Sequence, residues 1–160
     1  MRTIRMALAL ACAASLSAIC VAQAQSGAPA MSSTLPGTEK WMDIPAPALA
    51  GTPSVPIGGT LKVAILEGDP MTPGKSFTAR ISCTAGSKVA PHTHPTTENV
   101  TIVKGTFRMG MGAKWDDAAL KTLPTGAFFS MPSGMTHFAL CQGDTVVQIH
   151  GVAPLRFDFK

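Results

Sequence analysis

The sequence predicts an all-β domain built as a jelly roll or small barrel. Only 14% of the 160 residues are charged, whereas 15 are Gly and 13 are Pro. This composition favours short strands joined by turns over long solvated helices. Short runs rich in β-branched and aromatic residues are separated by Gly, Pro and Asp, which mark turns. Strands do not alternate with long helical stretches, so a doubly wound α/β fold is not expected.

The expected strands begin near residue 60 and number about eight. In the run 76–83, Phe77, Ala79 and Ile81 share one face because side chains alternate along a strand. Only the run W-D-D-A-A-L-K (115–121) is helix-like, with Asp116 able to cap it. The clearest strands are 61–67, 76–83, 99–104, 106–112, 127–131, 136–140 and 145–151.

Residues 1–24 read as a cleaved signal peptide. Arg2 and Arg5 precede an apolar stretch of small residues, and Ala22-Gln23-Ala24 is a small-x-small cleavage signal. The apolar stretch is too short for a lasting membrane span. We therefore expect a periplasmic or secreted protein with no membrane attachment after cleavage.

Residues 25–58 are expected to form a flexible leader followed by a Pro-rich arm. The run 45–56, P-A-P-A-L-A-G-T-P-S-V-P, is not expected to be helical, because Pro fixes φ and removes a backbone donor. Trp41 is the one large anchor of this segment, and we expect it to pack on the barrel or on a second subunit. A homodimer is therefore among the expected partners. Residues 59–160 are expected to form the single folded domain.

The charge pattern does not indicate nucleic-acid binding. Of the 13 Lys and Arg residues two lie in the signal peptide, so 11 remain against 9 acidic residues. No cluster of Lys and Arg with interleaved aromatic residues is visible, so the electrostatic footprint of such binding is missing.

Two stretches of the domain contain residues suited to binding a metal ion. In the first, His92 and His94 lie two residues apart and Glu98 follows four later; the second supplies His137. On a strand, residues two apart point the same way at a spacing of about 6.6 Å, so both imidazoles can face one ion. Imidazole with carboxylate suits borderline divalent metals. A lone H-x-H pair is more often a surface or core feature, and the joint pattern makes the metal interpretation the stronger one.

These stretches resemble the two conserved motifs of the cupin superfamily. The first motif is met at Gly86, His92, His94, Glu98 and Gly105, and the second at Gly126, Pro132, Gly134 and His137. The one departure is Cys141, which stands where the pattern has Asn. The resemblance covers about residues 59–160 and implies a cupin double-stranded β-helix, or jelly-roll barrel, with one short helix between the motifs. The runs G-D-P (68–70), G-M-G-A-K-W-D (110–116) and V-V-Q-I-H-G (146–151) also resemble those of small secreted single-domain bacterial cupins.

The resemblance also implies the ligand set and the cofactor. His92, His94, Glu98 and His137 are expected to hold one divalent transition metal, which could be Fe, Mn, Zn, Ni or Cu.

The residues around the ion are predicted from strand parity, with the ligand-bearing face taken as the lumen. Gln148 and His150 share a face of the last long strand, which is either exposed or directed into the lumen, and the lumen is favoured. His150 would then be the candidate acid or base, because imidazole is the side chain most suited to proton transfer near neutral pH and the chain has no Tyr. The expected apolar walls of the pocket around the ion are Phe107, Met109, Met111, Phe129 and Met131. The alternative for these five residues is that they only fill the core.

Two classes of function stay open. In the first, the protein is a mononuclear metalloenzyme that acts on a small oxygenated or aromatic compound. With Fe(II) the resemblance implies dioxygenase chemistry; with other metals it implies a Lewis-acid isomerase, lyase or hydrolase. In the second, it is a periplasmic cupin that binds a metal and a small ligand without turnover.

Cys83 and Cys141 remain after signal cleavage and form a candidate disulfide for an oxidising compartment. In the cupin fold, the strand before the first motif and the last strand are antiparallel neighbours, so the resemblance brings these residues near each other. Strand parity points Cys141 into the barrel, which leaves two buried free thiols as the alternative.

Overall fold

The computed structural model describes residues 31–160, and Ser32–Lys160 form one compact unit. The predicted signal peptide lies outside the described residues. Within residues 31–160, no helical segment has the length and apolar character needed to cross a membrane. The elements are β1 (Met42–Asp43), η1 (Ala46–Ala48), β2 (Leu49–Ala50), β3 (Leu61–Gly68), β4 (Ser76–Cys83), β5 (Lys88–Thr93), β6 (Glu98–Lys104), β7 (Thr106–Met111), η2 (Asp117–Ala119), β8 (Lys121–Pro124), β9 (Phe128–Met131), β10 (His137–Cys141), β11 (Thr145–Val152) and β12 (Phe157–Phe159).

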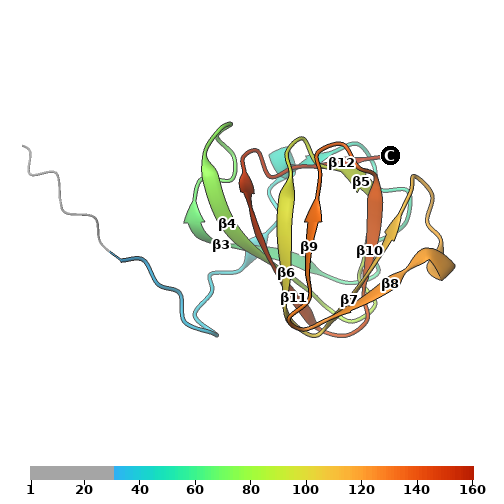
Figure 1. Ribbon diagram of the computed structural model, residues 1–160, viewed down its shortest axis with the longest axis horizontal. Helices are drawn as coiled ribbons and strands as arrows, with labels where there is room; N and C mark the ends of the chain where they lie inside the picture. The colour runs from blue at the N-terminus through green and yellow to red at the C-terminus, as the bar shows by residue number, and fades with distance from the viewer. Residues whose placement is uncertain (1–30) are drawn as a thin grey trace, which may run out of the picture. The chain divides into compact units, whose positions relative to one another are not determined.

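Two six-stranded sheets make up the unit, which confirms the predicted all-β jelly roll (Figure 1). The first sheet has the order β1-β3-β4-β11-β6-β9, and the second has the order β2-β12-β5-β10-β7-β8. The neighbouring strands are antiparallel except for β2 and β12. Strands distant in sequence are therefore hydrogen-bonded neighbours, and both predicted metal-binding stretches contribute to one lumen between the sheets.

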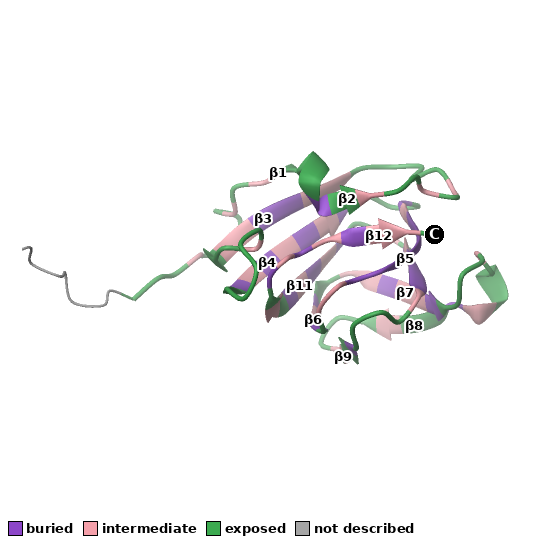
Figure 2. Ribbon diagram, turned by 90° about the horizontal axis from the view of Figure 1, so that it is seen from above, coloured by how far each residue is buried: buried purple, intermediate pink, exposed green. Residues whose placement is uncertain are grey.

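Alternating burial explains how the sheets enclose a core. Along β4 buried and half-buried residues alternate, so Phe77, Ala79 and Ile81 face inward as expected. The same alternation runs along most of β11, which pairs with β4 on one side and β6 on the other. Figure 2 shows the buried bands crossing these strands. Burying apolar area on the inner faces drives the two sheets together.

A bulge in β5 sets the direction of the first motif. His137 on β10 pairs with His92, and Ala139 pairs with Val89, so one extra residue of β5 lies between these two pairs. An extra residue bends a strand and re-aims its side chains. Val89 and His92 consequently both face the lumen, although they lie three residues apart.

The arm before β3 is tied to both sheets. β1 pairs with β3, β2 pairs with β12, and the side chains of Glu39 and Arg80 form a largely buried ion pair. Trp41 is half-buried on the barrel, near Ser82 and Cys83.

The expectation that the Pro-rich run contains no helix is wrong by one short turn. The 3-10 turn η1 forms at Ala46–Ala48 and includes Pro47. A Pro is tolerated there because the first residues of a helical turn need no backbone donor.

The helix-like run in the chain is shorter than expected. It is the single 3-10 turn η2, and the side chain of Asp116 accepts a hydrogen bond from the backbone N–H of Ala118, as a capping residue does. The preceding Trp115 packs against Phe138 on the outer face of the second sheet. Gly110 lies against the ring of Phe138 and has to be Gly, because a Cβ at residue 110 would lie 2.3 Å from that ring.

Cys83 and Cys141 are joined by a disulfide in the structure, with their Cα atoms 6.3 Å apart. Both residues are buried, and they lie on β4 of the first sheet and β10 of the second. The bridge therefore links the two sheets at the lumen. The alternative of two buried free thiols does not describe this structure.

Candidate metal centre

Three histidines meet at one end of the lumen. His92 lies in β5 and His137 begins β10, and the two are paired directly across the strands. His94 follows just after β5. Each offers a ring nitrogen, and these three atoms all lie within 4.8 Å of one another. All three side chains are buried, so the cluster is an interior feature and not a surface accident.

The backbone fixes which ring nitrogen each histidine presents. Nδ1 of His92 bonds the carbonyl of Ala90 at 2.7 Å, and Nδ1 of His137 bonds that of Met135 at 3.0 Å. Nδ1 of His94 bonds the carbonyl of Arg156 at 2.7 Å. A carbonyl only accepts, so each Nδ1 must hold the proton and each Nε2 is left with a free lone pair. Metal-binding histidines are oriented in this way in proteins.

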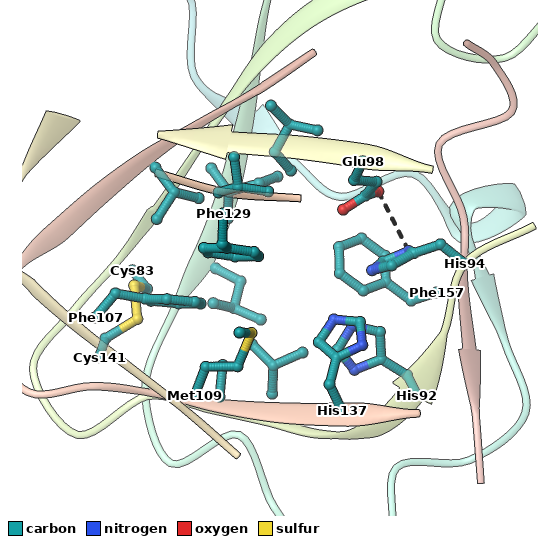
Figure 3. Close-up of a pocket in the computed structure, with 17 residues that line it drawn as sticks. Cys83, His92, His94, Glu98, Phe107, Met109, Phe129, His137, Cys141 and Phe157 are labelled. Carbon is teal, nitrogen blue, oxygen red and sulfur yellow. Dashed lines mark ion pairs between the residues drawn. A yellow bond between two sulfur atoms is a disulfide. The ribbon is translucent and has the colours of Figure 1, made fainter. Parts of the chain in front are cut away.

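Glu98 lies beside the three histidines but outside their group. Its Oε1 is 3.2 Å from Nδ1 of His94 (Figure 3). Because the proton on that nitrogen is directed to Arg156, Oε1 receives no hydrogen bond and is buried without a partner. A buried carboxylate oxygen without a partner is costly, and a cation would remove that cost.

Burial sets the charge of the centre when no cation is bound. Burial first, and then the neighbouring His137, lowers the pKa of His94 to about 4. Burial also lowers the pKa of His92 and His137, the former well below its usual value. Burial raises the pKa of Glu98 to about 8. At neutral pH His94 and Glu98 are therefore both uncharged, and their contact is not an ion pair. A cation that drew the proton from Glu98 would itself pair with the carboxylate.

These residues fit a divalent cation. Three neutral imidazoles, each with Nδ1 bonded to a backbone carbonyl, bring one ring nitrogen apiece to within 4.8 Å of one another, and the buried Oε1 of Glu98 beside them has no hydrogen-bond partner. His92, His94, His137 and Glu98 would hold the ion, and nitrogen with oxygen ligands suits Fe, Mn, Zn, Ni or Cu. The donor set alone does not select among these metals.

The rest of the lumen is apolar and ends at the disulfide. Figure 3 shows the histidines and Glu98 at one end and the Cys83–Cys141 bridge at the other. Between them lie Phe107 and Phe129, whose parallel rings have centroids 6.5 Å apart. The open space is about 50 Å³. That volume admits an ion with a few small molecules such as water or dioxygen, but not a drug-sized ligand.

Of the six residues predicted to form the pocket, three line the lumen and three do not. Phe107, Met109 and Phe129 line the lumen. Met111 is on the face of His137 but lies at the end of β7, where it is 46% exposed. Met131 is buried and pairs with Glu98 across β9 and β6, yet it does not line the cavity.

The placement of Gln148 in the lumen is wrong, and with it the proposed role of His150. Val147 and Ile149 line the lumen, so their two neighbours face outward. Gln148 accepts a hydrogen bond from Nε of Arg80 at 3.1 Å, and His150 is exposed, with Nδ1 3.3 Å from Oγ1 of Thr78. The physical reason is that most of the lumen is apolar, where an unpaired polar side chain would be costly.

Phe157 is the main site residue that the sequence reasoning missed. Its ring lies 5.1 Å from that of His92 and 5.2 Å from that of His94, between centroids. The alternation of Phe with charged residues in the final run R-F-D-F (156–159) was the available signal, because it predicts a strand with both rings on one face. The three backbone carbonyls that orient the histidines have no side-chain signature, so only the structure reveals them.

Comparison with known proteins decides the family. The sequence profile of the ChrR cupin-like domain matches residues 51–156. This chain belongs to the ChrR cupin-like family. The match includes all four residues of the candidate metal centre and begins inside the arm, ahead of β3.

Several known proteins are similar to this chain in sequence or in fold. Over 68 residues, 42% of its length, this cupin is 37% identical to germin-like protein 5-1 of Oryza sativa, of which the match covers 31%. The chain thus spans about a third of the length of the curated relatives that it matches. Among solved structures, an RmlC-like cupin from Shewanella frigidimarina superposes with a TM-score of 0.53 at 18% identity, over 74% of this chain and 87% of that one. KdgF from Halomonas sp. gives 0.53 at 17% identity, over 77% and 94%. These likenesses show the fold.

Proposed function

We propose that this cupin is a mononuclear metalloenzyme of dioxygenase type that acts on a small oxygenated or aromatic compound. The observation that supports this most directly is the set of three buried histidines whose Nδ1 atoms are all held by backbone carbonyls. That arrangement prepares three ligand atoms for one ion before it binds. When bound, the metal would supply redox or Lewis-acid activation of dioxygen or of an oxygenated substrate.

The chain's own residues prepare this site in three ways. The Nε2 atoms of His92, His94 and His137 bind the ion. Glu98 would give up its proton as a cation enters, and its carboxylate would then be the fourth group that holds the ion. The apolar walls formed by Phe107, Met109 and Phe129 exclude water from the space beside the histidines.

The structure also favours chemistry that needs no separate acid or base from the protein. Among the residues that line the lumen, all of them in the described part of the chain, the titratable side chains are the four members of the candidate metal centre. The exposed His150 does not reach it. Lewis-acid isomerases and lyases that depend on a protein base are accordingly less well supported than a dioxygenase.

A second function is also consistent with a lumen whose titratable side chains are only the four of the candidate metal centre. It is that of a non-catalytic cupin that holds a metal and a small ligand. Metal analysis of protein purified from its own compartment, followed by oxygen uptake with diols, diketones and aromatic acids, separates the two. The enzyme proposal expects uptake with at least one class of compound. A metal-loaded protein that consumes no oxygen and forms no product with any of these metals contradicts it and leaves the binding protein.

We also propose that the mature protein is secreted or periplasmic. The Cys83–Cys141 bridge supports this, because disulfides persist in oxidising compartments. Mass spectrometry of the exported protein should find an N-terminus at Gln25. A full-length chain retained in the cytoplasm would contradict the proposal.

A further inference from the structure

A second cavity lies behind the wall of the metal-binding lumen, beneath the N-terminal arm. Its volume is about 270 Å³, against about 50 Å³ for the lumen itself. Arm residues Leu49 and Ile57 form its roof, and they are 42% and 36% exposed. We call this cavity the arm chamber. It is lined mainly by Ile44, Leu49, Ile57, Leu61, Val89 and Phe157.

The arm chamber and the lumen share their dividing wall. Leu61, Val89 and Phe157 line both cavities. Phe157 is the part of this wall nearest the metal centre, because its ring centroid lies 5.1 Å from that of His92. Phe157 is thus a side chain of the dividing wall whose ring also contacts the histidines of the metal centre.

The chemistry of the arm chamber selects a neutral apolar ligand. Of its lining residues, which all lie in the described part of the chain, only Lys88 has a charged side chain. The Lys88 ammonium is already placed over the ring of Trp115, 4.8 Å from its centroid. An apolar cavity of about 150 Å³ is large enough to bind benzene. The arm chamber therefore has room for a molecule with one substituted ring.

The roof of the chamber is also the part best able to open. The arm is tied down near it by the two-residue pairing of β2 with β12 and by the hydrogen bond from the Lys88 N–H to the Ile57 carbonyl. Segments with few hydrogen bonds and half-exposed apolar side chains open at low free-energy cost. A ligand can enter beneath the arm without separating the two sheets, which the disulfide holds together.

We propose that the arm chamber is a binding site for a small neutral molecule with one apolar ring, and that Phe157 is the gate between this site and the three-histidine centre. The binding step stands on the cavity alone. The passage to the metal rests on the proposed function, because it would bring a ring held in the larger chamber next to the metal centre of that function.

Fluorobenzene followed by ¹⁹F NMR tests the binding step in the metal-free protein. Leu49→Trp and Ile57→Trp fill the chamber from its roof, and Leu35→Trp adds the same ring at an exposed arm position away from the chamber. We expect binding to wild type and to Leu35→Trp, and an affinity lower by about tenfold or more in the two roof variants. No binding to wild type, or equal binding to all four proteins, overturns the proposal.

Paramagnetic relaxation tests the gate. With Mn²⁺ loaded and its content measured, the fluorine of bound fluorobenzene should relax several-fold faster than in the Zn²⁺-loaded protein, because the chamber borders the metal centre. Phe157→Leu should increase this enhancement, whereas Phe128→Leu, at an exposed position on β9, should leave it unchanged. An enhancement absent in wild type, or equal in Phe157→Leu and wild type, overturns the gate. A protein that takes up no metal contradicts the proposed function, and the metal-free experiment still decides the chamber.

Discussion

At the scale of single residues, the candidate centre depends on where protons are held. The backbone holds a proton on Nδ1 of His92, His94 and His137 and leaves each Nε2 free. Burial keeps the proton on Glu98 up to about pH 8. The metal-free centre is therefore neutral near pH 7, and loss of the Glu98 proton would offset one of the two positive charges of an entering divalent cation.

Glu98 gives the metal-free protein a pH dependence of stability that can be measured. Between its ordinary pKa of 4.5 and about 8, the folded protein holds a proton on Glu98 that the unfolded chain has released, so the free energy of unfolding falls as pH rises. The three buried histidines raise the free energy of unfolding as pH rises, because the unfolded chain binds protons that the folded histidines do not. This effect operates only below their ordinary pKa of 6.5. Between pH 6.5 and 8 we expect a decline of at most about 1.4 kcal/mol per pH unit.

Urea unfolding of metal-free wild type and of Glu98→Gln across this pH range measures the effect. The neutral amide keeps the shape of the side chain and does not titrate, so the variant should show a flatter dependence. The same slope in both proteins would mean that Glu98 is already ionised in the fold.

At the scale of elements, the sequence predicted the long strands β3, β4, β6, β7 and β11, but it directed the wrong face of β11 into the lumen. The motif spacing identified the histidines that meet in the structure, because glycines and strand alternation fix their register. The bulge in β5 has no signature that a single sequence reveals, yet it turns both Val89 and His92 inward. Alternation along β11 allowed either face of the strand to point into the lumen. Because most of the lumen is apolar, Val147 and Ile149 point inward and Gln148 and His150 point outward.

The disulfide is the strongest covalent constraint between elements, because it links β4 to β10 across the two sheets and spans 58 residues of chain. Replacing both cysteines, as in Cys83→Ala with Cys141→Ala, should lower the free energy of unfolding by about 4 kcal/mol. Chemical denaturation of the double variant and of oxidised and reduced wild type measures this. Reduced wild type should resemble the double variant. A double variant as stable as oxidised wild type would show that the bridge does not hold the sheets together.

At the scale of the whole molecule, the arm is the part of the described chain that links the two sheets from outside. It pairs with β3 through β1 and with β12 through β2. Trp41 packs on the barrel near the disulfide and remains partly exposed. The sequence located this arm by its prolines but could not place it, because the pairings of two residues each depend on sheet edges that form only in the folded domain.

A homodimer stays a prediction at this scale, and we propose that the outer surface around the arm contributes to it. Exposed apolar residues such as Met42 and the half-buried Trp41 are of the kind that gather at interfaces. Sedimentation of the mature chain at high micromolar concentration should find the dimer, and Trp41→Ala should weaken it. A wild-type protein that stays monomeric under these conditions would rule the interface out.

Metal content of single variants tests the central claim most directly, which is that His92, His94, His137 and Glu98 hold one divalent ion. Wild type and variants are loaded with the same metal, passed through a desalting column and analysed for metal per chain. We predict a single ion per chain in wild type, a nearly empty site in His94→Ala and His137→Ala, and a content near wild type in His150→Ala, whose side chain lies on the outer face. A His150→Ala protein without metal beside a His137→Ala protein that retains it would contradict the account.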